Sequence, residues 1–259
     1  MCRIHFFESA CPGAGEKHWR LTRRDARYQL QMGIPMALQF AITSSGTMIM
    51  QSAINLFGSE AVAAYTAACK VHSLLTQGMV AMGQTMAVYS GQNYGKGDAK
   101  RIRDGVKAAL LIDVIYSVVS AVLVSLLLGV TLGLFFSGDV DLTVMMPWAR
   151  TYITICTLFY IPLSTIFIFR NTMQGCGYGF LPMMGGVVEL VARLSVAMIA
   201  MRVHSYALSC FCDPAAWLSA GLFTGVSYLF VRRRSGHHWN RSQLRFSHDR
   251  TVKPYSKYR

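Results

Sequence analysis

Long apolar runs separated by short polar turns dominate the pattern of this chain. The segment 33–93 is mostly apolar, as is nearly all of 106–231, and a glycine-rich basic turn at 91–107 joins the two. About 20 apolar residues are needed to cross the hydrocarbon core of a bilayer. The pattern therefore predicts six membrane-spanning helices, at 33–56, 61–89, 106–136, 143–169, 180–201 and 207–231.

Three prolines bear on the shape of these predicted helices. Pro35 falls in the first turn of the first span, where proline is tolerated because that N–H has no helical partner. Pro147 and Pro162 fall inside the fourth span. Proline in a helix interior removes a hydrogen bond and bends the axis. We therefore expect the fourth span to be kinked.

Composition supports a membrane protein of the all-α class. Hydrophobic residues make up 53% of the chain, charged residues 14%, and the mean hydropathy is +0.35; an ordinary soluble domain has about 25% charged residues. The formal net charge of +13 raises the alternative of nucleic-acid binding. The cations, however, gather at the termini and in the 91–107 turn, not on a folded face with interleaved aromatics. We expect membrane lipid, and no nucleic acid, as a partner.

The distribution of charge predicts the orientation. Cytoplasmic loops of membrane proteins collect Lys and Arg, and the cations near 20–27, 96–107, Arg170 and 232–234 all fall on one side of the predicted bundle. The other side holds the acids Glu60, Asp139 and Asp141, and its only cations are Arg150 and Arg202 near span ends. We expect a multi-pass protein of a bacterial-type inner membrane with both termini cytoplasmic. The predicted divisions are a basic lead-in at 1–31, a six-span lobe at 32–232 and a basic, disordered tail at 233–259.

Several short polar motifs at the ends of the predicted spans form an ordered set over roughly 200 residues. They include a Gly-Ile-Pro stretch at 33–35, Gln-Asn-Tyr-Gly at 92–95, Phe-Arg-Asn at 169–171 and a Glu-Leu segment at 189–190. This set resembles the second half of a multidrug and toxic compound extrusion (MATE) transporter. The signature positions that carry the resemblance are Pro35, Gln92, Asn93, Gly95, Arg170, Asn171 and Gly175.

The resemblance implies a fold, a function and a missing partner. MATE transporters contain two six-helix bundles around a V-shaped cleft and export organic cations in exchange for sodium or protons. This chain holds one such bundle, so the resemblance implies that the first lobe is missing and that the chain is truncated and not competent alone. The alternative is a half-transporter or non-transporting fragment that assembles with a partner lobe or with itself as a homodimer.

Ionisable groups within the spans are the candidates for function, because burying one at mid-bilayer costs about 2.5–3.5 kcal/mol on insertion scales. Glu189 lies midway along the fifth span, and Arg193 follows one helical turn later, at a spacing that allows an ion pair. Glu189 is either a cation or proton site facing the cleft or half of a structural pair. Both interpretations stay open.

The remaining candidates carry weaker signals. Asp113 in the third span would either relay protons or reach the interface by snorkelling, and His72 in the second span would either titrate near neutral pH or pack as a satisfied histidine. Gln39, Thr43 and Gln51 offer uncharged polar groups to a cleft or to neighbouring helices. No acid occurs at 39–45, where some MATE transporters are expected to carry one, so the coupling ion stays open between sodium and a proton.

Enzymatic chemistry is not predicted. The seven cysteines include no pair of C-x-x-C motifs with zinc-site spacing, and the Gly95-x-Gly97 pair lacks the strand that a phosphate-binding loop requires. No constellation for hydrolysis occurs, and we expect no cofactor and no metal. The sequence thus predicts a transporter lobe and not an enzyme.

Overall fold

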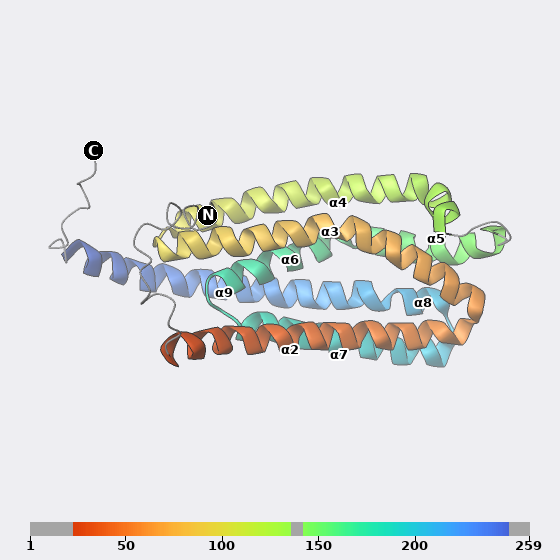
Figure 1. Cartoon of the computed structure of the whole chain (residues 1–259), viewed down its shortest axis with the longest axis horizontal. Helices are drawn as coiled ribbons and strands as arrows, with labels where there is room; N and C mark the ends of the chain where they lie inside the picture. The colour runs from red at the N-terminus through yellow and green to blue at the C-terminus, as the bar shows by residue number, and fades with distance from the viewer. Residues whose placement is uncertain (1–22, 136–141, 249–259) are drawn as a thin grey trace, which may run out of the picture.

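The protein folds as a bundle of long helices that lie roughly along one axis (Figure 1). The computed structural model describes residues 23–135 and 142–248. The elements are α2 (Arg23–Ile54), the 3-10 helix η2 (Asn55–Phe57), α3 (Ser59–Gly95), α4 (Ala99–Phe135), α5 (Leu142–Leu158), α6 (Tyr160–Gly175), α7 (Phe180–Val203), α8 (Tyr206–Cys210) and α9 (Cys212–His248). The predicted all-α class is confirmed. The predicted turn at 137–141 lies outside the described residues.

The helices pack in an order that differs from their order along the chain. α2 packs on α7, α7 on α9, α9 on α6, α6 on α3 and α3 on α4 (Figure 1). Consecutive α2 and α3 make few contacts with each other and diverge from their connection at η2. The cavity described below lies between these two helices.

α4 covers one side of the bundle and turns most of its apolar surface outward. The exposed large side chains on this helix include Leu111, Ile115, Val118, Val122 and Leu126. A helix whose backbone hydrogen bonds are satisfied internally and whose outer face is apolar suits hydrocarbon as its solvent. This face is therefore a lipid-contacting surface.

Within the described ranges, three spans meet the length and composition of a membrane crossing: Ala99–Val130, Phe180–Val203 and Tyr206–Arg233. The bent pair Thr143–Leu158 and Tyr160–Gly175 makes a fourth when counted as one span. α2 and α3, with 32 and 37 residues, are long enough to cross but are less apolar. Some of the polar side chains that lower their hydropathy line an internal cavity described below.

The fourth predicted span is broken, as its prolines predicted. α5 and α6 meet at Phe159 with a bend of 53°. Pro162 explains the position of the break, because it cannot donate to the carbonyl four residues earlier, at Leu158, and its ring crowds that carbonyl. Pro147 lies within α5 without interrupting it.

Two helix ends differ from the sequence-based boundaries. α2 begins at Arg23, so Pro35 lies in the helix interior and not in its first turn. α9 is helical to His248, beyond the boundary expected at residue 232. Residues 1–22 of the predicted lead-in and 249–259 of the predicted tail lie outside the described residues.

α3 and α6 approach each other closely through small residues. Gly83, Ala87 and Gly91 recur every fourth residue on α3, and a Cβ added at Gly175 of α6 would collide with the Ala87 carbonyl. A Cβ at Gly83 would lie 2.7 Å from Asn171 Nδ2. Small residues at this spacing let membrane helices pack backbone to backbone. The signature positions Asn171 and Gly175 thus belong to a helix contact.

The basic turn between α3 and α4 is stabilised by its own polar groups. Asn93 Nδ2 donates to the Tyr89 carbonyl at 2.7 Å, and the Arg101 backbone N–H donates to Asp98 Oδ1 at 2.9 Å. The second bond places Asp98 as the N-cap of α4. Gln92, Asn93 and Gly95 therefore lie in the last turn of α3, where they end one helix just before the next begins.

Candidate functional site

A buried network of four charged side chains lies at the centre of the bundle. Glu189 of α7 accepts from Arg170 of α6, Nη2 to Oε2, at 3.1 Å, and from Arg193, Nη2 to Oε1, at 3.2 Å. The same Arg193 Nη2 lies 2.9 Å from Oδ1 of Asp213 on α9. All four residues are less than 10% exposed. Two cations and two anions alternate, so the network is neutral as a whole.

Helix spacing and close packing position these charged side chains. Glu189 and Arg193 are one turn apart on α7, where side chains of i,i+4 residues meet. Arg193 also packs against Gly46 of α2, where an added Cβ would collide with its Nη1 atom. Burying charges is costly unless they are paired with good geometry. The alternation of partners from three helices meets that requirement.

Some hydrogen-bonding capacity of the network is unused. Among the described residues, Arg170 Nε, Arg193 Nε and Arg193 Nη1 have no hydrogen-bond partner. Buried polar groups in native structures nearly always have one. The unpaired donors lie on residues that also line a cavity, so the network can donate further hydrogen bonds to an acceptor atom of a bound group or of water.

The cavity beside the network has a volume of about 300 Å³ and is lined by α2, α3, α5, α6, α7 and α9. All four network residues contribute to its wall. It reaches the surface between α2 and α3, where its lining residues Phe40, Thr47 and Ser73 are exposed. A group entering between these two helices would meet the charged network inside the lobe.

Aromatic side chains also line the cavity. His72 stacks on Trp217 with ring centroids 5.6 Å apart and an interplanar angle of 12°. Its Nδ1 lies 2.9 Å from the Tyr160 hydroxyl, and Tyr65 packs edge-on against Tyr152 at 5.0 Å. Aromatic faces attract cations through the ring quadrupole. The cavity thus joins aromatic surface to carboxylates.

The structure brings five of the predicted site residues to this cavity. They are Gln39, Thr43, His72, Glu189 and Arg193. Gln39 is buried and accepts from Gln174 Nε2 at 3.0 Å, and Thr43 donates to the Gln39 carbonyl at 3.0 Å. His72 has a hydrogen-bond partner in the Tyr160 hydroxyl and a stacking partner in Trp217, as expected for a histidine that is satisfied by packing.

Two predicted residues lie away from the cavity. Gln51 is half-buried near the end of α2, where its Nε2 lies 3.5 Å from Asn55 Oδ1. Asp113 of α4 is 1% exposed, which differs from the expectation that it reaches the interface by snorkelling. Its Oδ2 atom has no hydrogen-bond partner within the described part of the chain.

Sequence reasoning missed Asp213 and Trp217, and it treated Arg170 as a loop signature and not as a partner of Glu189. A signal existed for Asp213, since it is an acid inside the sixth predicted span and its burial needs a reason. For Arg170 the partner is 19 residues away on another helix, and no local pattern identifies that contact. Among the described residues, no group of three or more His, Cys, Asp or Glu side chains is placed to hold a metal ion.

Comparison with known proteins assigns the fold. A family model described as MatE matches residues 35–199. The probable multidrug resistance protein NorM of Brucella suis is 26% identical over 155 residues, which are 60% of this chain and 33% of NorM. The probable multidrug resistance protein YpnP of Bacillus subtilis is 33% identical over 73 residues.

Solved structures match over more of the chain. A crystal structure of MATE in complex with MaL6 superposes with a TM-score of 0.76 at 16% identity, covering 86% of this chain and 50% of that one. The chain thus spans half of this structure and a smaller share of the curated relatives. The fold match and the family match agree with the resemblance carried by the signature motifs. The chain is a multi-pass membrane protein that belongs to the MATE family.

Proposed function

We propose that this lobe forms one half of a secondary transporter that exports organic cations by antiport with sodium or protons. The observation that carries the proposal is the cavity in which Glu189 lies between Arg170 and Arg193 beside aromatic side chains. The relatives NorM and YpnP are described as probable multidrug resistance proteins, which supports the substrate class. The chain spans half of the matched structure. We therefore propose that this lobe transports only when it is paired with a second lobe.

A cation entering between α2 and α3 would compete with the arginines for the carboxylates. The aromatic wall provides attraction that does not depend on the shape of the cation, which suits varied substrates. Glu189 then offers the negative charge, and Arg170 is the partner that a bound cation would displace. The neutral network keeps the empty cavity stable without a free buried charge.

Antiport requires that the coupling ion and the substrate favour different states of the same network. A ligand shifts a conformational equilibrium by no more than its differential affinity for the two states. A sodium ion or proton at Glu189 would weaken both of its ion pairs and free Arg170 and Arg193. The Glu189 carboxylate can thus bind the substrate in one state and the coupling ion in the other. Antiport requires this mutually exclusive binding.

The proposed location is a bacterial-type inner membrane with both termini cytoplasmic. The end of the bundle that holds the start of α2, the α3–α4 turn and the end of α9 carries Arg23, Lys96, Lys100 and Arg232 (Figure 1). The opposite end carries Glu60 at the start of α3 and Arg202 in the last turn of α7. Lys and Arg collect on the cytoplasmic side of membrane proteins, which supports this orientation.

The test is efflux of a fluorescent cationic dye from a bacterium that lacks its own drug pumps. We expect little efflux from the chain alone and gradient-driven efflux when it is co-expressed with the first lobe of a MATE transporter. Efflux from the chain alone would indicate a homodimer. Absence of efflux from the pair under both sodium and proton gradients, with both chains present in the membrane, would contradict transport and favour the alternative of a non-transporting fragment.

Glu189→Gln separates the role of this residue from folding when it is compared with Arg170→Gln/Glu189→Gln. The single substitution leaves Arg170 as an uncompensated buried charge, whereas the double substitution keeps the network neutral and leaves the Arg193–Asp213 pair in place. If Glu189 couples transport, the double variant is folded and lacks gradient-driven efflux. Normal efflux in the double variant would make Glu189 a packing residue.

A further inference from the structure

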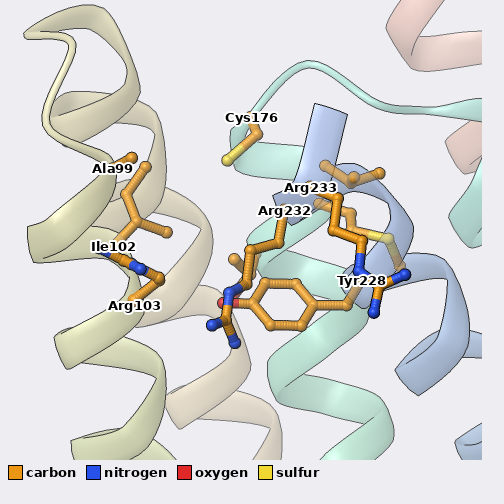
Figure 2. Close-up of a pocket in the computed structure, with 10 residues that line it drawn as sticks. Ala99, Ile102, Arg103, Cys176, Tyr228, Arg232 and Arg233 are labelled. Atoms are coloured by element: carbon orange, nitrogen blue, oxygen red, sulfur yellow. The ribbon is translucent and has the colours of Figure 1, made fainter. Parts of the chain in front are cut away.

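A second pocket lies at the end of the bundle, between the start of α4, the end of α6 and the last crossing turns of α9 (Figure 2). Its volume is about 200 Å³, the liquid volume of roughly six or seven water molecules. The transport cavity and this pocket share no lining residue. We propose that this pocket binds the phosphate head group of an anionic phospholipid.

Three arginines supply the charge. Arg103 comes from α4, and Arg232 and Arg233 come from α9. Figure 2 shows the Arg232 guanidinium beside the hydroxyl of Tyr228, whose ring lies across the pocket. None of the described lining residues is an acid. Guanidinium groups bind phosphate through paired N–H donors, so the site is complementary to a phosphate and not to a cation.

The inner wall of the pocket contains an unused hydrogen-bonding group. Thr172 is 1% exposed, and its Oγ1 atom has no hydrogen-bond partner among the described residues. A buried hydroxyl without a partner costs free energy, and an oxygen of a bound phosphate ester would accept from it. Burial raises the pKa of the neighbouring Cys176 thiol to about 11. That thiol therefore stays neutral near pH 7 and does not oppose an anion.

The position of the pocket selects a lipid over a soluble phosphate. The candidate spans Ala99–Val130 and Tyr206–Arg233 both terminate here, which is the depth at which lipid phosphates lie. On α9, Val226 and Phe230 are exposed and lie seven and three residues before Arg233, so all three share one helix face. Acyl chains can follow this apolar stripe while the head group reaches the arginines, as in basic pockets that bind anionic lipids between membrane helices.

The experiment measures lipid retention by the full 259-residue chain. The protein is reconstituted in mixed phosphatidylglycerol and phosphatidylcholine, extracted in mild detergent, and its bound lipids are counted by native mass spectrometry. We expect preferential retention of phosphatidylglycerol. Arg103→Gln/Arg232→Gln/Arg233→Gln should reduce that retention by about tenfold or more, since each basic residue near a lipid surface contributes appreciably.

The matched control is Lys96→Gln/Lys100→Gln/Lys107→Gln, which removes three exposed cations from the same end of the bundle but not from the pocket. It should leave retention within about twofold of the wild type, because the lost charges do not contact the head group. Equal loss in both triple variants would indicate diffuse attraction and overturn the proposal.

Thr172→Val tests the buried hydroxyl with a side chain of similar shape, and it should lower phosphatidylglycerol retention with the helical circular dichroism unchanged. Unchanged phosphatidylglycerol retention in Thr172→Val would show that the Thr172 hydroxyl does not contact the lipid. Displacement of the lipid by inorganic phosphate alone would identify a soluble phosphate ester as the ligand and overturn the lipid assignment. No preference for phosphatidylglycerol in the wild type would refute the site.

Discussion

Glu189 and Asp113, two of the three buried carboxylates among the described residues, differ in their hydrogen-bonding partners. Glu189 on α7 is 5% exposed and pairs with two arginines from two helices. Asp113 on α4 is 1% exposed, and within the described residues its Oδ2 has no hydrogen-bond partner. A paired carboxylate can remain charged inside the protein, whereas an unpaired one is costly to bury in the charged form. The comparison separates an acid held by two ion pairs from an acid with an unused acceptor atom.

The difference follows from where each acid lies. α7 packs between α2 and α9, so its residues can meet charges from several helices. α4 packs on α3, α6 and α5, but only 22% of its candidate span window is buried within the protein, so most of its side chains face outward. Helices α6, α7 and α9 bring opposite charges together around Glu189, whereas no ion pair to Asp113 on α4 forms among the described residues.

The largest expected effect comes from breaking the network at Arg193. Arg193→Met removes the ion pairs to Glu189 and Asp213 and leaves Asp213 as a buried, uncompensated charge. We expect a loss of about 3–5 kcal/mol in the free energy of unfolding, measured by denaturant titration in detergent micelles. Arg193→Met/Asp213→Asn restores neutrality and should recover most of this loss. A double variant no more stable than the single one would show that charge pairing is not the source.

A smaller effect is expected from a methyl group placed against the network. Gly46→Ala puts a Cβ where the Arg193 Nη1 atom lies, and overpacking of this kind costs about 1–3 kcal/mol. Gly33→Ala on the same helix is the matched control, since nothing lies within 4 Å of its added Cβ. The control should be neutral or stabilising because alanine favours the helix. Equal thermal stabilities of the two variants would mean that Arg193 moves away freely.

The smallest effect is expected at Asp113. Asp113→Asn replaces an acid whose Oδ2 has no partner among the described residues by an amide of the same shape, so we expect a change of about 1 kcal/mol or less in the free energy of unfolding. The measurement is the same denaturant titration used for Arg193→Met. A loss as large as that of Arg193→Met would show that Asp113 has a charged partner and would remove the contrast between the two acids.

Much of the fold was predictable because membrane insertion leaves a strong pattern. The apolar runs marked the helices, Pro162 marked the break between α5 and α6, and the signature motifs identified the family. The ends of α2 and α9 were not predicted, because polar residues 23–32 and 233–248 continue helices that the apolar pattern does not require.

The site was predictable only where its contacts are local. Glu189 and Arg193 are one helical turn apart, so their pairing follows from spacing. Arg170 and Asp213 join them from separate helices, and helix packing decides which distant residues meet. The same reason explains Asp113, whose burial depends on how α4 packs against its neighbours and not on its place in the sequence.

Binding of a cationic dye to the cavity tests the central claim most directly. Trp217 stacks on His72 in the cavity wall, so a bound dye should quench its fluorescence in the full chain reconstituted in lipid nanodiscs. Trp217→Phe should abolish the saturable part of the quenching and identify which of the four tryptophans reports it.

The decisive comparison is the affinity of the wild type with that of Arg170→Gln/Glu189→Gln, which keeps the cavity neutral but removes the carboxylate of Glu189. If Glu189 receives the cation, we expect the dissociation constant to rise about tenfold or more, as loss of a charged partner at a buried site predicts. An unchanged dissociation constant, with the quenching still dependent on Trp217, would contradict the claim that Glu189 receives the cation. The dye would then bind without contacting the charged network.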